Sequence, residues 1–160
     1  DLLKNDLGDI ELFGENLYAV HSIEYKRLET HFYVFAVRCL DKWLSWEEVK
    51  FYAALFDLPT VPELCTERVN GLTAETLKQH VICLAGEPSV FGSRDVLTGM
   101  DCTREGVVTR NAGEYLTADF ARNVFKYVRQ GHVQTDEHWT RHWKRARLVW
   151  ESKQEKGGNE

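Results

Sequence analysis

Hydrophobic and polar residues follow one another along this chain in patterns that predict both strands and helices. The run FYVFAVRC at residues 32–39 is aromatic and β-branched and is too apolar for an edge, so it predicts a central strand. Ser45 and Glu48 have the spacing of a capping box, and apolar residues then recur at helical intervals. This pattern predicts a helix that continues to Leu58, where Pro59 stops it.

Three further elements are predicted in the second half of the chain. Residues 73–84 carry an apolar stripe at helical spacing and predict a second helix. Residues 104–110 have a β-branched centre between charged ends, which indicates a strand. Residues 120–129 fit both a helical and an alternating pattern, and we predict a strand from Asn123 onward.

A last helix is predicted from a cap at Thr135 or Asp136. We expect its apolar stripe to pack into the core rather than to stack on bases. The stripe consists of Trp139, Trp143, Ala146 and Trp150. Helices and strands in this mixed order make the fold class α+β, or mixed α/β.

Composition sets the size and class of the protein. With 43% apolar residues among 160, the chain is long enough to bury roughly 70% of its unfolded surface. It has three prolines and no Gly/Ser-rich linker, so we expect one continuous domain over residues 1–155 and a flexible tail at residues 156–160. No apolar run approaches the roughly 18 to 20 residues of a spanning helix, which excludes a transmembrane protein.

Charge is distributed unevenly along the chain. The formal net charge is −5, yet residues 121–147 hold seven Lys and Arg against two acidic residues, a local +5. An acidic body with one basic segment fits a polyanionic partner, for which Arg141, Lys144 and Arg145 are candidate phosphate contacts. A charged helix face that is simply solvated is the alternative interpretation.

The cysteine pattern bears on the compartment. The four cysteines are Cys39, Cys65, Cys83 and Cys102, and no two of them form a CxxC pair. This spacing indicates neither a zinc site nor a disulfide framework, so a reducing compartment is the default. No signal or transit peptide is visible. We therefore expect an intracellular protein, cytoplasmic or nuclear.

Three short segments occur in an order that is characteristic of one enzyme superfamily. FGENLYA at residues 13–19, EGVV at 105–108 and KYVR at 126–129 resemble motifs III, IV and V of the covalent nucleotidyltransferases, which include ATP-dependent ligases and capping enzymes. Longer strings resemble the ATP-dependent RNA ligase branch. These are ENLYAVHSIEY (15–25), FYVFAVR (32–38), WLSWEEV (43–49) and KYVRQGHVQTDEHW (126–139). The resemblance covers about residues 10–143.

The resemblance implies a fold and a reaction. The fold would be a ligase-type nucleotidyltransferase domain with mixed, mainly antiparallel sheets flanked by helices. The reaction would join an RNA 3′-hydroxyl to a 5′-phosphate in three steps: a lysine is adenylylated by ATP, AMP passes to the RNA 5′-phosphate, and the 3′-hydroxyl releases AMP. Such a site must hold a ribose, stack a base, bind Mg²⁺ or Mn²⁺ and neutralise phosphate oxygens.

The resemblance also assigns roles to individual residues. Glu15 would accept hydrogen bonds from the ribose hydroxyls, and Gly14 beside it would let the backbone approach the ligand closely. Phe35 lies where the family places an aromatic ring against adenine, although a core role is the ordinary interpretation of such a residue. Glu105 would lie beside the metal ion and the α-phosphate, because its hard oxygen atoms suit Mg²⁺ or Mn²⁺.

Two cations would complete the phosphate site. Lys126 would supply a point charge for the α-phosphate, and Arg129 could bind a second phosphate with its two-pronged guanidinium. Many relatives have a lysine two residues after the first, where this chain has Val128. Strand alternation places Lys126 and Val128 on one face, so a site that contains both Lys126 and Arg129 requires a twist or a strand end. The role of Arg129 therefore stays open.

The nucleophilic lysine of the family is not identified in this chain. Lys4 stands in KNDLG, but the glycine falls one position late and only ten residues separate Lys4 from Glu15. We therefore expect the motif I lysine, in a K-x-D-G type sequence, upstream of Asp1. DNA ligase and capping guanylyltransferase are alternatives within the superfamily. A non-catalytic RNA-binding or regulatory protein that has lost motif I is the alternative from another class.

Overall fold

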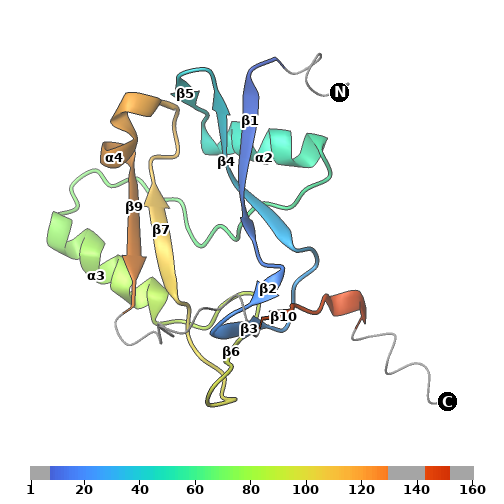
Figure 1. Cartoon of the computed structure of the whole chain (residues 1–160). Coiled ribbons are helices and arrows are strands. Elements are labelled where there is room, and N and C mark those ends of the chain that lie inside the picture. The colour runs from blue at the N-terminus through green and yellow to red at the C-terminus, as the bar shows by residue number, and fades with distance from the viewer. Residues whose placement is uncertain (1–7, 130–142, 152–160) are drawn as a thin grey trace. The chain divides into compact units, whose positions relative to one another are not determined.

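The structure is a computed structural model that describes residues 8–129 and 143–151. Its helices and antiparallel strand pairs confirm an α+β fold (Figure 1). The chain divides into two compact units. Unit 1 comprises Asp1–Glu15, Phe32–Thr66 and Val108–Phe125, and unit 2 comprises Asn16–His31, Glu67–Val107 and Lys126–Glu160.

A four-stranded sheet is the centre of unit 1. Its strand order is β1-β4-β5-β8. The bounds are β1 Ile10–Asn16, β4 Phe32–Cys39, β5 Lys42–Trp43 and β8 Tyr115–Leu116. Antiparallel pairing sets Arg38 opposite Trp43, and Trp43 opposite Tyr115. The predicted central strand at residues 32–39 is confirmed, because β4 has a neighbour on each side.

Helix α2 (Trp46–Leu55) packs on β4 and forms the main core of unit 1. The buried residues of this core are Val34, Val37, Leu44, Trp46, Val49 and Ala53. The predicted helix is confirmed, but it ends at Leu55 and not at Leu58. The reason lies in the backbone beyond it: Val34 donates to the carbonyl of Pro59 over 2.9 Å and accepts from Val61 over 2.9 Å. The chain therefore leaves the helix in a turn at Phe56 and Asp57, where Asp57 has a φ of 55°.

The start of α2 is fixed by the predicted capping box. The Glu48 carboxylate accepts from the Ser45 backbone over 2.9 Å, and the Ser45 side chain accepts from the Glu48 backbone. The Ser45 side-chain and backbone hydrogen bonds hold the pKa of Glu48 below its usual value of 4.5. The charged form of Glu48 is thus the form that stabilises the helix terminus.

Replacing the cap residue should destabilise unit 1 measurably. Ser45→Ala removes a side-chain acceptor at the helix N-terminus, so we expect it to lower the free energy of unfolding by about 1 kcal/mol. A carboxyl whose pKa is lowered by folding contributes stability that is lost as pH falls through its folded pKa. Urea titrations at pH 7 and pH 3 should therefore show a smaller Ser45→Ala effect at pH 3. An equal effect at both values would contradict this coupling.

Residues 120–129, which fit both a helical and a strand pattern, form a short helix and then a strand. A 3-10 turn η1 (Thr117–Asp119) leads into the short helix α4 (Phe120–Asn123), and strand β9 (Val124–Val128) follows directly. The predicted strand is confirmed. Its partner is β7 (Gly106–Arg110), which confirms most of the predicted strand at residues 104–110.

Unit 2 contains one longer helix and two short strand pairs. Helix α3 (Ala74–Ala85) begins after its cap Thr73, as predicted. Strand β3 (Ile23–Tyr25) pairs antiparallel with β6 (Ser93–Asp95). Strand β2 (Ala19–Val20) pairs antiparallel with β10 (Lys144–Arg145).

The predicted last helix is wrong at residues 143–148, whereas residues 149–151 are helical. Lys144 and Arg145 form β10, because their backbone groups pair with β2 instead of with a preceding helical turn. The expected core stripe is also wrong in part: Ala146 is buried, but Trp143 and Trp150 are about half exposed. Trp139 and the predicted caps lie outside the described residues. None of the described helices has both the length and the apolar character to span a membrane.

Candidate functional site

The β7–β9 pair positions three of the predicted site residues. Glu105 immediately precedes β7, and Arg129 immediately follows β9. The Arg129 backbone donates to the Glu105 carbonyl over 3.0 Å. At the far end of the two strands, the Asn111 backbone donates to the Asn123 carbonyl over 2.8 Å, so the strands run antiparallel. This pairing places Glu105 beside Arg129.

Gly106 allows this close pairing. A Cβ at position 106 would lie far inside the van der Waals contact distance of the Tyr127 carbonyl oxygen on β9. The obstructing atom belongs to the backbone, so a change of side-chain rotamer cannot relieve the contact. The glycine of the EGVV motif is therefore required by the approach of β9, one residue away from Lys126.

Adding a methyl group at Gly106 should disrupt the pairing. We expect Gly106→Ala to cost about 1 to 3 kcal/mol of stability, as overpacking does elsewhere. It should also displace Glu105 from Arg129. Gly113→Ala is a matched control, because its Cβ would meet only the Asn111 side chain at an ordinary 3.5 Å. Urea unfolding of both variants measures the difference, and equal stabilities would contradict the close-approach interpretation.

Arg104 anchors the backbone just before Glu105. Its guanidinium donates to the Leu84 carbonyl at the end of α3 and to the Glu87 carboxylate over 2.9 Å. Its backbone donates to the Glu87 carbonyl over 3.0 Å. The Arg104 side chain is only 14% exposed, whereas Glu105 is exposed. The Glu105 carboxylate therefore stands on a backbone that is fixed from both sides.

Lys126 and Arg129 have different surroundings. Lys126 is exposed and forms no ion pair with any residue that the structure describes. Arg129 is partly buried, and within the described parts of the chain its buried Nε has no hydrogen-bond acceptor. A site that contains both Lys126 and Arg129 requires a twist or a strand end. β9 ends at Val128, so Arg129 lies beyond the end of the strand. A cation with a buried, unsatisfied donor is suited to an anionic ligand.

Glu15 and Phe35 belong to unit 1. Glu15 is exposed near the end of β1. At Gly14 the Phe32 ring occupies the space that a Cβ would need, and the approach of a ligand to this backbone stays a prediction. Phe35 is 38% exposed, although its neighbours Val34 and Ala36 are buried. The core interpretation of Phe35 is therefore wrong, and its ring is accessible to a ligand.

Arg110 fixes the backbone at Phe35, a role that the sequence did not reveal. Its guanidinium donates to the Phe35 carbonyl over 2.9 Å and to the Leu44 carbonyl over 3.0 Å. It also lies 5.7 Å from the Trp46 ring and 5.9 Å from the Tyr115 ring. Burial lowers the pKa of Arg110, and the nearby Tyr115 opposes this shift in part. The sequence showed only that Arg110 is the last residue of the predicted strand at residues 104–110.

Two of the three candidate RNA contacts can be placed. Lys144 and Arg145 are exposed on β10 in unit 2. Arg145 forms an ion pair with Glu151 over 2.5 Å, and the hydrogen bond from Arg145 lowers the pKa of Glu151. Arg141 lies outside the described residues.

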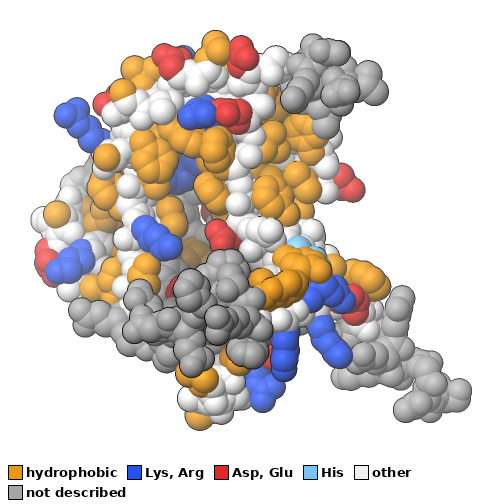
Figure 2. All heavy atoms as spheres, viewed as in Figure 1, with side chains coloured by type: hydrophobic (Ala, Val, Ile, Leu, Met, Phe, Trp, Pro, Cys, Tyr) orange, Lys and Arg blue, Asp and Glu red, His pale blue; other side chains and the backbone are white. Residues whose placement is uncertain are grey.

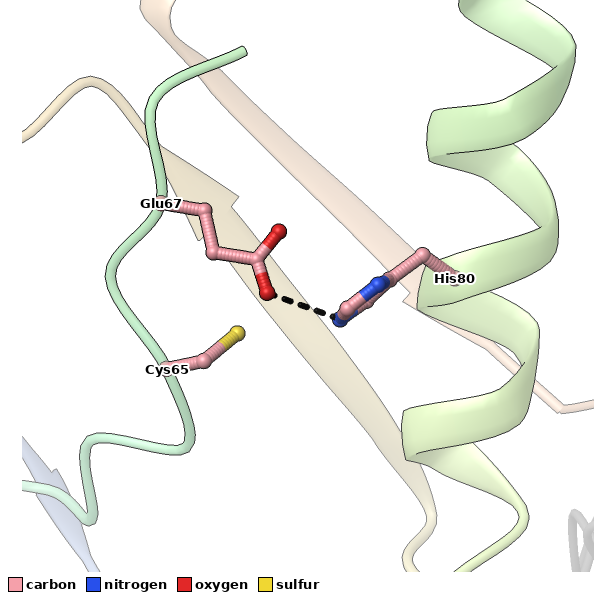
Figure 3. A group of neighbouring side chains, drawn as sticks. All are labelled: Cys65, Glu67 and His80. Atoms are coloured by element: carbon pink, nitrogen blue, oxygen red, sulfur yellow. Dashed lines mark ion pairs between the residues drawn. The ribbon is translucent and has the colours of Figure 1, made fainter. Parts of the chain in front are cut away.

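A separate acid and imidazole pair lies in unit 2. The Glu67 carboxylate is 3.8 Å from Nε2 of His80 on α3, and the two side chains point toward one another (Figure 3). Cys65, drawn in the same view, belongs to unit 1. Glu67 and His80 form an ion pair when the imidazole is protonated. The Glu67 and His80 pair offers two ligand atoms, whereas zinc sites have three or four protein ligands.

Comparison with known proteins identifies the family. The searches of curated proteins and of solved structures returned no match to this chain. A family model described as RNA ligase matches residues 1–128 of the 160. The matched region contains all of β7 and β9 and the predicted residues Glu15, Phe35, Glu105 and Lys126. Because the match spans most of the sequence, the chain belongs to the RNA ligase family.

Proposed function

We propose that this chain is the nucleotide- and phosphate-binding part of an ATP-dependent RNA ligase, which joins RNA 3′-hydroxyl and 5′-phosphate ends in RNA repair. The domain would extend over residues 1–155, with a tail at 156–160, in an intracellular protein. The proposal combines family membership with the chemistry of the side chains at the ends of β7 and β9.

One observation carries the proposal further than family membership. The buried Nε of Arg129 has no acceptor among residues 8–129 and 143–151, and the Arg129 backbone is hydrogen-bonded to Glu105. An unsatisfied buried donor costs about 1 to 3 kcal/mol, and an anionic ligand would remove that cost. A phosphate is the anion that a ligase must hold. Arg129 would bind it with its guanidinium, and Lys126 would add a second positive charge.

For the nucleotide base and ribose we propose the roles that the resemblance assigns to Phe35 and Glu15. Phe35 offers an exposed ring, and stacking of a base on an aromatic ring is worth about 1 to 3 kcal/mol. Arg110 holds the backbone of Phe35, so the ring need not be ordered when the nucleotide binds. Glu15 is an exposed carboxylate that would accept hydrogen bonds from the ribose hydroxyls.

Glu105 fits a divalent metal ion. Its carboxylate is exposed, and hard oxygen atoms are the ligands that Mg²⁺ and Mn²⁺ prefer. A bound ion would neutralise charge on the phosphate oxygens. Glu105, Lys126 and Arg129 would orient the α-phosphate for attack by a lysine, which we place in the segment upstream of Asp1. That attack would form a lysyl-AMP bond and release pyrophosphate from ATP, and AMP would then pass from the lysine to the RNA 5′-phosphate.

The test is sealing of a nick by the protein that carries its natural residues upstream of Asp1. The substrate is a duplex with one nick in an RNA strand, supplied with ATP and Mg²⁺. We expect a sealed strand that depends on both ATP and the 5′-phosphate. RNA binding without sealing and without an AMP adduct would overturn the proposal in favour of a non-catalytic RNA-binding protein. Preferential sealing of an all-DNA nick would overturn the choice of substrate.

A further inference from the structure

The last described segment of the chain is tightly joined to residues 17–31 within unit 2. The Ala146 backbone donates to the Tyr18 carbonyl over 2.7 Å, and Nε2 of His31 donates to the Ala146 carbonyl over 2.9 Å. The Val149 backbone donates to the Leu28 carbonyl over 2.8 Å. Ala146 and Leu28 are both buried. The side chains that flank these contacts are therefore held on a fixed backbone.

Two aromatic side chains on this joined segment remain accessible. Tyr18 is 41% exposed and Trp143 is 46% exposed. The Tyr18 ring lies 5.0 Å from the His31 ring at 74° and 5.6 Å from the Trp143 ring at 55°. Neither contact is a parallel stack, so these neighbours do not cover the full face of either ring. An unpaired base would find accessible π surface here.

Basic residues follow Trp143 directly in the sequence. Residues 143–151 contain Lys144, Arg145 and Arg147 against one acidic residue, Glu151. Arg145 lies near Tyr18 along the backbone, because the register of β2 and β10 sets Arg145 opposite Ala19. Figure 2 shows hydrophobic and basic side chains side by side over the region of β2 and β10. Aromatic rings combined with cations are the features by which proteins bind single-stranded nucleic acid.

We propose that Tyr18 and Trp143 form a stacking platform for an unpaired base of the RNA substrate, and that Arg145 binds the adjacent phosphate. This inference rests on the proposed function, because that function makes RNA the polyanion to be bound. It assigns to Trp143 a role in RNA binding rather than in the core. A protein partner would require only the apolar area of these side chains, whereas RNA also requires an accessible π face and nearby cations.

The test separates stacking from charge. Fluorescence anisotropy of a labelled single-stranded RNA of about 12 nucleotides would measure affinity at several salt concentrations. We expect Trp143→Leu to weaken binding about 5- to 100-fold and Trp143→Phe to weaken it less, since leucine keeps the apolar bulk but lacks a π face. Trp143→Leu should leave the salt dependence unchanged, whereas Arg145→Gln should reduce its slope by about one ion.

The matched control is Trp150→Leu. Trp150 is 53% exposed in the same segment, and among the described residues it is outside the Tyr18 cluster. We expect it to bind RNA like the unaltered chain. Equal affinity of Trp143→Leu and Trp150→Leu would overturn the platform, and so would an absence of RNA binding by the unaltered chain.

Failure of the platform is distinguishable from failure of the proposed function. Formation of an AMP adduct requires ATP but no RNA, so it can be measured in the same variants with the upstream residues present. A normal adduct with unaffected RNA binding in Trp143→Leu would overturn the platform alone. No adduct in any variant would overturn the proposed function, and the anisotropy comparison would still decide the platform.

Discussion

Replacing Lys126 or Glu105 by alanine should reduce formation of the AMP adduct by about 10²- to 10³-fold when labelled ATP and Mg²⁺ are supplied to the protein with its upstream residues. The reason is electrostatic: loss of one preorganised group that stabilises phosphate charge typically has an effect of this size. Both residues are exposed, so their removal should leave the fold intact. Adduct yield per minute is the measurement.

Two controls test the specificity of this result. Lys78 is an exposed lysine on α3, and Glu47 is an exposed carboxylate on α2. Lys78→Ala and Glu47→Ala should retain the full adduct yield, because neither residue is adjacent to β7 or β9 in the sequence or assigned to the site. If a variant at Lys126 or Glu105 gives the same adduct yield as the unaltered protein, that residue does not belong to the site.

Replacing Arg110 should have the largest effect on stability. Arg110→Ala leaves the carbonyls of Phe35 and Leu44 without their donor and removes the cation above the Trp46 ring. Hydrogen bonds to charged groups contribute about 1.5 to 3 kcal/mol each, so we expect a loss of about 3 to 5 kcal/mol in the free energy of unfolding. Urea unfolding of the chain measures it.

A second arginine provides the comparison for Arg110. The side chain of Arg122 on α4 is 86% exposed and pairs only with Asp119 at 4.0 Å among the described residues. Arg122→Ala should change stability by less than about 0.5 kcal/mol, as exposed ion pairs usually do. A loss below about 1 kcal/mol for Arg110→Ala would show that the two carbonyls find other donors. The buried guanidinium would then not be what fixes Phe35.

Local patterns predicted the elements whose cause is local. The β4 strand was visible as an apolar run at residues 32–39, and the start of α2 was visible as the Ser45 and Glu48 capping box. The end of α2 was not visible, because it depends on pairing of the backbone around Pro59 with β4. Long-range pairing of this kind leaves no periodic signal near the residue concerned.

The same limit explains the error at the end of the chain. Trp143 and Ala146 have helical spacing, but the backbone there pairs with β2, more than one hundred residues earlier. Spacing alone cannot distinguish a helix stripe from aromatic residues that flank a short strand. The role of Arg110 was hidden for a related reason, since its acceptors are the carbonyls of Phe35 and Leu44, and carbonyls have no sequence signature.

Some features of the candidate site could be predicted from the sequence, and others could not. Motif resemblance predicted Glu105 and Lys126 together with their order in the chain, and the structure places both at the β7–β9 pair. The sequence could not show that Gly106 is required by the Tyr127 carbonyl, or that the buried Nε of Arg129 lacks an acceptor in the part of the chain that the structure describes. Both facts depend on how two backbones approach each other. They are also the facts that give the phosphate proposal its physical content.

The most direct test of the central claim is to map the AMP adduct by mass spectrometry. The protein with its natural upstream residues is incubated with ATP and Mg²⁺, and the 160-residue chain is treated in parallel. The account predicts one AMP per protein on a lysine upstream of Asp1, and no adduct on the 160-residue chain. A stoichiometric adduct on Lys4, or on any other lysine within the 160 residues, would contradict it, and so would the absence of an adduct from both proteins.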